Sequence, residues 1–435
     1  MSKNLNKIVA FAIGVSIFTG SIVPAMADTV NNSNVNNGVQ ATSLVNNKVL
    51  TLNEAFESAK AKSNTLAILD KNIQLMNSIN GLNEKLDDVN NLTDLTEDYN
   101  EDKRKLTLDK LEQKREFQID KLKQDVTKAY NGLIVSSKEI SKLKSDIELQ
   151  KEEIEQAKLK RNLGLMTDIN IDQVQISLQS NQNTLDNKQN VFNDDKYNFK
   201  VLTGKDVDKY VLEDTIKYDK FELSGSLDEY LDSVIGEFTT YSEQLNELES
   251  DYWNDDDNKI SNSDVSKAKD YYDEHKDDAE PKLDLSQYGD DIDGMNKKIN
   301  AIADYVSKTK ETSNALSKYT GILSARMNYL NNKSAAETSK LQLDETKDMY
   351  KKSLRTIYTN LINIEKSIDL IQANVELKNK QVKIDKINYD LGLKTKLEYD
   401  KSVNECETLN NQLLSTIDSY NNLKAQLEKP WLVLS

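Results

Sequence analysis

The chain has 435 residues, of which 73 are acidic and 57 are basic, so its formal net charge is −16 at pH 7. Proteins that bind nucleic acids neutralise phosphates with an excess of Lys and Arg, so this balance argues against nucleic-acid binding. The three prolines and 13 glycines leave few breaks in the chain, which favours long helices over short elements joined by turns.

The first 27 residues have the pattern of a secretory signal peptide. A basic start ends at Lys7, an apolar run covers 8–23, and the small residues Ala25 and Ala27 then fit the requirement of signal peptidase. We expect cleavage before Asp28 and export to the cell envelope or the extracellular space. The alternative is a retained membrane anchor, which is disfavoured by the two glycines within the run and the proline just after it.

Residues 28–48 are rich in Asn, Ser, Thr and Val and are predicted to form a flexible leader. Beyond them no stretch of about 18 apolar residues occurs, so we expect no bilayer-spanning segment in the mature chain. The single cysteine, Cys406, excludes an intramolecular disulfide. Stability is therefore expected to come from helix packing.

From residue 126 onward the chain carries a heptad pattern. Apolar or small side chains recur every three or four positions, with a polar interruption at Gln150, and a second run with the same spacing follows later. This spacing is typical of the seam of a coiled coil. The first seam comprises Val126, Ala129, Leu133, Ser136, Ile140, Leu143, Ile147, Ile154 and Ala157, and the second comprises Leu354, Ile357, Leu361, Ile364, Ile368, Ile371, Val375 and Val382.

The two seams belong to an internal repeat. A shift of 228 positions aligns Tyr130 with Tyr358 without a gap, and the match continues beyond the seams. We therefore divide the mature chain into a first repeat over 49–205 and a second repeat over 206–430. The second repeat is longer because it carries an acidic insertion near 250–340.

Each repeat is predicted to contain one long helical hairpin. The rising arm of the first, over about 103–162, would be ~90 Å long at 1.5 Å per residue, so it must lie along a neighbour. The returning arms have apolar residues at the same spacing, so we expect the two arms to pair. These residues are Val174, Leu178, Leu185, Phe192, Phe199 and Leu202 in the first repeat, and Cys406, Leu409, Leu413, Tyr420, Leu423 and Leu427 in the second.

A Leu-Gly-Leu-x-Thr motif lies between the arms, and we interpret it as the tip of each hairpin. Its glycine can adopt a left-handed backbone conformation that ends a helix, and Thr167 or Asp168 can cap the next helix. In the second repeat Lys396 replaces the aspartate, so the cap depends on Thr395 alone. The tip residues are Leu163, Gly164, Leu165, Thr167, Asp168, Leu391, Gly392, Leu393 and Thr395.

The tips, the opening motif over 50–55, the closing motif over 202–204 and the tandem duplication resemble those of the TolC-type outer-membrane efflux proteins. The resemblance implies an all-α fold in which three protomers, each with two antiparallel coiled-coil hairpins, form a hollow tube. It also implies that the tips dock an adaptor of the membrane-fusion type, which connects the tube to an inner-membrane transporter. The alternative is that the tips are simply helix-breaking turns.

Members of this family insert a pair of transmembrane strands into each half, seen as stretches of about ten residues that alternate between apolar and polar. In this chain 81–120 and 250–300 instead carry charges that would lie on both faces of a strand. Because a charge that faces lipid costs ~2–4 kcal/mol, we expect a TolC-like helical tube without a transmembrane β-barrel. Such a tube would suit a cell that has no outer membrane.

The sequence provides little for catalysis. His275 is the only histidine, no Gly-x-Gly motif occurs, and no spacing suggests a nucleophile with its base. Zinc sites built from Cys and His are excluded by the same counts. We therefore expect no enzyme activity and no cofactor.

The acidic insertion leaves two questions open. The aspartates at 255–257 could hold calcium loosely, but no loop has the arrangement of an EF-hand, which favours a solvated acidic loop. The tyrosines Tyr252, Tyr271, Tyr272 and Tyr288 could pack an irregular subdomain, or they could form a surface that binds glycans of the cell wall.

Two functional classes remain. The first is a TolC-like conduit, a homotrimer that exports small molecules or polypeptides with an adaptor and an inner-membrane transporter. The second is a secreted coiled-coil structural or interaction protein of the cell surface without a lumen. A tube requires each helix to contact neighbours on two sides. Apolar residues off the seam at matching positions, Ile134 with Ile362 and Leu159 with Ile387, favour the tube.

Overall fold

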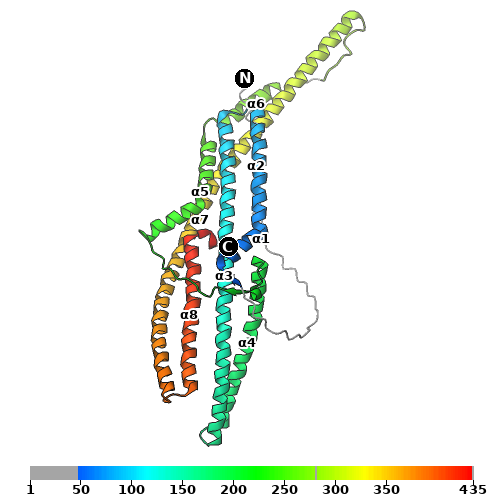
Figure 1. Ribbon diagram of the computed structural model, residues 1–435. Coiled ribbons are helices and arrows are strands. Elements are labelled where there is room, and N and C mark those ends of the chain that lie inside the picture. The colour runs from blue at the N-terminus through cyan, green and yellow to red at the C-terminus, as the bar shows by residue number, and fades with distance from the viewer. Residues whose placement is uncertain (1–47, 280–281, 434–435) are drawn as a thin grey trace. The chain divides into compact units, whose positions relative to one another are not determined.

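The computed structural model describes residues 48–279 and 282–433 (Figure 1). Ala25, Ala27 and Asp28 of the expected cleavage site, and the expected leader up to residue 47, lie outside the described residues. In chain order the elements are β1 (Lys48–Leu50), α1 (Leu52–Lys62), α2 (Asn64–Asn90), α3 (Asp94–Asn162), α4 (Asp168–Thr203), η2 (Val207–Lys209), β2 (Tyr210–Leu212), α5 (Leu227–Asn254), α6 (Asn262–His275), α7 (Ile292–Asp390), α8 (Lys396–Glu428) and η3 (Pro430–Leu432).

Long helices dominate the fold, as the scarcity of Pro and Gly predicted. Helix α3 has 69 residues and helix α7 has 99 residues. Most of the acidic insertion is helical, because α6 and the first part of α7 lie within it. Among the described residues, no helix combines the length and the apolar character needed to cross a bilayer.

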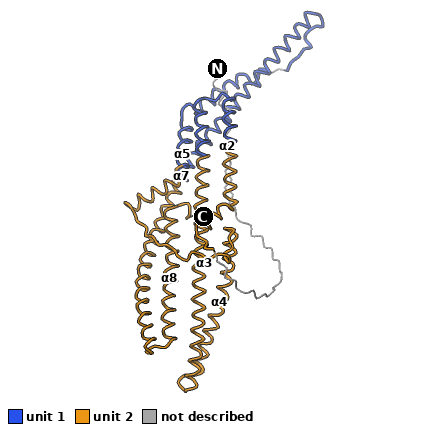
Figure 2. Tube along the Cα trace, viewed as in Figure 1, with its two compact units in different colours: residues 1–44, 77–107, 241–343 blue, residues 45–76, 108–240, 344–435 orange. Residues whose placement is uncertain are grey.

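The contacts between residues divide the described chain into two compact units, coloured separately in Figure 2. Among the described residues, unit 1 contains 77–107, 241–279 and 282–343, and unit 2 contains 48–76, 108–240 and 344–433. The paired parts of both hairpins, with both tips, belong to unit 2, whereas the acidic insertion belongs to unit 1.

The first repeat begins with a short strand and a capped helix. Strand β1 pairs in parallel with β2, which follows the first hairpin in the chain. Helix α1 starts with a capping box, in which the Thr51 hydroxyl accepts the Glu54 N–H and the Glu54 carboxylate accepts the Thr51 N–H. Ser226 and Glu229 make the same reciprocal pair at the start of α5, so the two repeats open alike.

Tyr130 on α3 connects the hairpin to this sheet. The residue is 2% exposed, and its hydroxyl donates to the Leu50 carbonyl at 2.6 Å and accepts the Glu213 N–H at 2.7 Å. The ring of Phe199 from α4 lies beside it, with 6.2 Å between ring centroids. One buried hydroxyl is therefore the hydrogen-bond partner of both a backbone carbonyl at the end of β1 and a backbone N–H just after β2.

The predicted seams are buried, which confirms the pairing of the arms. Val126 and Leu133 on α3, and Leu354 and Leu361 on α7, are at most 1% exposed. The apolar positions predicted on the returning arms are buried or half-buried on α4 and α8, and Tyr420 on α8 is 0% exposed. The hairpins are therefore α3 with α4 and α7 with α8 (Figure 1).

The exposure of the apolar residues off the seam differs along the hairpins. Ile134 is buried at 4% exposure and Ile362 is half-buried. Leu159 and Ile387, which lie closer to the tips, are 64% and 58% exposed. The outer surface near the tips is therefore more apolar than a helix facing only water requires.

The end of the chain packs against the first repeat within unit 2. The Trp431 ring stacks on Phe117 of α3 at 4.1 Å between ring centroids, and its indole N–H donates to Asp120 at 3.2 Å. Lys429 forms an ion pair with the same carboxylate at 2.5 Å. The residues just after α8 thereby fasten the second repeat to α3.

Unit 1 is organised around an aromatic cluster. Tyr99 of α3 stacks on Tyr252 of α5 at 3.8 Å between ring centroids, and Trp253 meets the Tyr252 ring edge-on at 4.9 Å. Lys103 donates to the Tyr99 hydroxyl at 2.9 Å and pairs with Glu249 at the same distance. Tyr252, which could have served a glycan-binding surface, is thus a core residue with 7% exposure.

Helix α6 is held against α7 by polar contacts. The Thr312 hydroxyl donates to the His275 carbonyl at 2.8 Å, and the Tyr271 hydroxyl donates to Glu311. The Tyr272 ring stacks on Tyr319 at 5.7 Å between ring centroids. These tyrosines pack the subdomain, which favours packing over glycan binding.

We expect Tyr130→Phe to lower the free energy of unfolding of unit 2 by about 1–3 kcal/mol, because the buried Leu50 carbonyl and the partly buried Glu213 N–H lose their shared partner. Tyr358→Phe, at the aligned position of the second repeat, is the matched control and should change this free energy by less than about 0.5 kcal/mol. Denaturant unfolding followed by circular dichroism measures both. Equal effects of the two substitutions would contradict the bridging role of Tyr130.

The stability of unit 1 should depend on pH through His275. The Asp278 carboxylate, 2.7 Å from Nδ1, raises the pKa of His275 above its ordinary value of 6.5. The charged imidazole therefore stabilises the fold below that ordinary value, and this contribution is lost as the pH rises through the raised pKa. The difference in thermal midpoint between the natural protein and His275→Gln should be constant below about pH 6 and should shrink above about pH 7. A difference that does not change between these limits would contradict the ion pair.

Candidate functional site

The two tips have the same backbone structure. In the first tip Gly164 has φ 72°, its N–H donates to the Arg161 carbonyl, and the Leu165 N–H donates to the Lys160 carbonyl. This pair of bonds around a left-handed glycine is the Schellman motif that ends helices. The predicted role of the glycine is confirmed.

The second tip repeats this geometry. Gly392 has φ 73°, its N–H donates to the Tyr389 carbonyl, and the Leu393 N–H donates to the Asn388 carbonyl. The Lys394 N–H donates to the same Asn388 carbonyl at 3.2 Å, which adds a bond that the first tip lacks among the described residues. A Cβ on either tip glycine would meet nothing within 4 Å, so only the positive φ requires glycine there.

The leucines of both tips project into solvent. Leu163 and Leu165 are 73% and 74% exposed, and Leu391 and Leu393 are 67% and 73% exposed. Contact between apolar side chains and water is unfavourable, so a partner that covered these leucines would gain binding free energy. The structure thus places each tip leucine where a partner could reach it.

The helix caps after the tips differ. Thr395 forms a capping box with Glu398, whose pKa is lowered chiefly because its carboxylate accepts the Thr395 N–H at 2.8 Å. Thr167 occupies the equivalent position, but its hydroxyl donates to the Asn170 side chain and caps no backbone N–H. Asp168 pairs with Arg161 at 2.5 Å instead. The side-chain cap predicted for Thr167 or Asp168 is therefore wrong, and the third residue of α4 is Asn170 where α8 has the glutamate that completes its capping box.

Behind the second tip lies a buried carboxylate that the sequence prediction missed. The side chain of Asp385 is 3% exposed, its Oδ1 lies 2.5 Å from Lys394 Nζ, and it accepts the Gln381 amide at 2.9 Å. Asp385 follows Val382 at seam spacing, so a charge at a seam position was the signal that could have revealed it.

Polar contacts also join the two hairpins behind the tips. Asn404 of α8 donates to Asp146 of α3, and Lys401 pairs with Glu153. Lys396, the first residue of α8, lies 3.5 Å from Glu152. The two tips are thus carried by hairpins that contact each other within unit 2.

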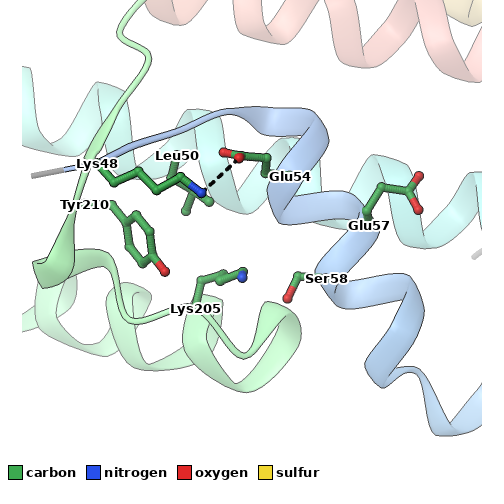
Figure 3. A pocket seen from close by; sticks show the side chains of 7 residues that line it. All are labelled: Lys48, Leu50, Glu54, Glu57, Ser58, Lys205 and Tyr210. Atoms are coloured by element: carbon green, nitrogen blue, oxygen red, sulfur yellow. Dashed lines mark ion pairs between the residues drawn. The ribbon is translucent and has the colours of Figure 1, made fainter.

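An open pocket of about 280 Å³ lies where the start of the first repeat meets its end (Figure 3). Lys48 pairs with Glu54 at 3.4 Å, and Ser58 donates to the Thr203 carbonyl at 2.7 Å. The lining residues are Lys48, Leu50, Glu54, Glu57, Ser58, Lys205 and Tyr210. Several of these polar groups already pair with each other or with the backbone, so the pocket is part of the junction between the ends of the repeat.

The described residues offer no cluster for a metal ion. Within 48–279 and 282–433, no group of three His, Cys, Asp or Glu side chains lies close enough together to hold a metal ion. His275 is engaged by Asp278, and Cys406 is buried. The two tips are therefore the best candidates for a functional site.

Comparison with known proteins identifies the fold. No family model and no curated protein sequence matches the chain. The Campylobacter jejuni CmeC outer membrane channel matches with a TM-score of 0.50 and 12% identity, over 93% of this chain and 94% of that chain. The outer-membrane channel OprN matches with a TM-score of 0.53 and 11% identity, over 88% of this chain and 90% of that chain. The all-α fold with tandem hairpins predicted from the TolC resemblance is therefore confirmed.

Proposed function

We propose that the protein is a subunit of an export conduit in the cell envelope and that it works with an adaptor and an inner-membrane transporter. The observation that carries the proposal is the pair of hairpin tips, which have the same Schellman geometry and expose their leucines. The fold, shared with outer-membrane channels, supports it. In this proposal Leu163, Gly164, Leu165, Thr167 and Asp168 of the first tip face the adaptor. Leu391, Gly392, Leu393 and Thr395 do so in the second tip.

The conduit is a homotrimer in this proposal. Leu370, Leu377 and Ile384 recur every seven residues along α7, and each is 52–67% exposed. Residues at this spacing form one face of a helix, separate from the buried seam. We call these three residues the α7 stripe and assign it to a neighbouring copy of the chain.

The remaining features of the proposal come from the sequence. Residues 1–27 direct export as a signal peptide and are removed before Asp28, with Ala25 and Ala27 at the cleavage site. The repeats over 49–205 and 206–430 supply one hairpin each. The protein conducts or passes on a cargo and catalyses no reaction.

The trimer is tested with residues 28–435. We expect a trimeric mass in solution and particles with a central channel in electron microscopy. Leu377→Glu should abolish the trimer without loss of helix content, because it places charges in an apolar interface. Lys383→Glu, which is exposed on α7 outside the stripe, is the matched control and should remain trimeric. A monomer or dimer without a channel would instead support the alternative, a secreted coiled-coil protein of the cell surface.

The docking role is tested by changing Gly164 and Gly392 together to Val. A β-branched residue at positive φ is strained, so both tips should change conformation while the hairpins stay folded. We expect the double variant to keep its trimeric mass and helix content and to lose co-purification with a membrane-fusion-type adaptor from the same cell. Unchanged co-purification would refute the assignment of the tips.

A further inference from the structure

The second tip contains an ion pair with a buried carboxylate, whereas the Arg161–Asp168 pair of the first tip is exposed on both sides. The Asp385 carboxylate is buried in the seam of the second hairpin and meets Lys394 of the tip. A buried charge is tolerated in a protein only when it is paired and hydrogen-bonded. The Lys394 ammonium therefore stabilises a carboxylate that the hairpin cannot otherwise accommodate.

The electrostatics of the pair agree with its geometry. The Lys394 ammonium, followed by the buried Ser402 hydroxyl, lowers the pKa of Asp385 to about 2. The carboxylate is thus charged throughout the neutral pH range, and it requires a counter-charge at every pH in that range. Lys394 belongs to the tip itself, between Leu393 and the helix cap Thr395.

The internal repeat supplies a natural comparison. The shift that aligns the repeats places Ala157 opposite Asp385 and Met166 opposite Lys394. Ala157 is 5% exposed, so the first hairpin fills the same seam position with a methyl group. The first tip therefore has the same Schellman turn without a charged side chain that binds it to the seam.

We propose that Asp385 is a positioning residue that holds Lys394, and with it Leu391–Leu393, in one conformation, so that the second tip is rigid whereas the first is adaptable. A conformation of the tip that moved Lys394 away would leave the carboxylate buried and unpaired. A change in the conformation of the first tip leaves no buried charge unpaired, so this tip can adjust to a partner. The inference rests on the proposed docking function, to which it adds that the second tip is preorganised for its partner.

Hydrogen exchange of the trimer, followed by mass spectrometry, tests the inference without any partner. After correction for intrinsic rates, peptides covering 388–396 should exchange more slowly than those covering 160–168. Asp385→Asn should speed exchange at the second tip by about tenfold or more, as expected when a hydrogen bond to a charged group is lost. The first tip serves as the internal control and should not change.

The double variant Asp385→Ala with Lys394→Met installs the residues of the first repeat. Its second tip should exchange about tenfold or more faster than that of the natural protein while the seam stays folded, because an apolar pair can replace a buried ion pair. A second tip that keeps its slow exchange in either variant would overturn the inference, as would equal acceleration of both tips. Adaptor capture is measured separately, so failure of the natural protein to capture the adaptor would refute the docking function and leave the exchange result standing.

Discussion

The burial of a narrow apolar seam between two antiparallel helices is the constraint on which the rest of unit 2 depends. Leu354, Leu361 and Ile368 are fully buried along α7, and full burial of such a side chain is worth about 1.5–3 kcal/mol. The remaining surface of these helices is largely polar, so neither arm would be stable alone in water. Once the seam is closed, the position of each tip is fixed by the length of its arms.

The features that could be predicted from the sequence are those that depend on neighbours along the chain. Seam residues recur with the period of a helix, and the glycines of the tips mark a backbone conformation that few other residues adopt. The duplication then made each hairpin evidence for the other. For these reasons the all-α fold, the paired arms and the left-handed Gly164 and Gly392 were all predicted.

The features that were missed depend on contacts between distant segments. The stacking of Trp431 on Phe117 and the pairing of Tyr99 with Tyr252 join residues far apart in sequence, and no local pattern identifies such partners. The error at Thr167 has a different origin. Thr167 occupies the cap position, but the third residue of the helix that follows is Asn170 and not the glutamate that completes the capping box at Thr395.

The positions of the two tryptophans have a practical consequence. The chain contains only Trp253 and Trp431, and the first lies in the aromatic cluster of unit 1 whereas the second stacks on Phe117 in unit 2. Each unit therefore carries a single tryptophan in a packed aromatic environment. Replacement of either tryptophan by Phe would leave the tryptophan emission of one unit alone, so the cooperativity between the units can be followed optically without an added label.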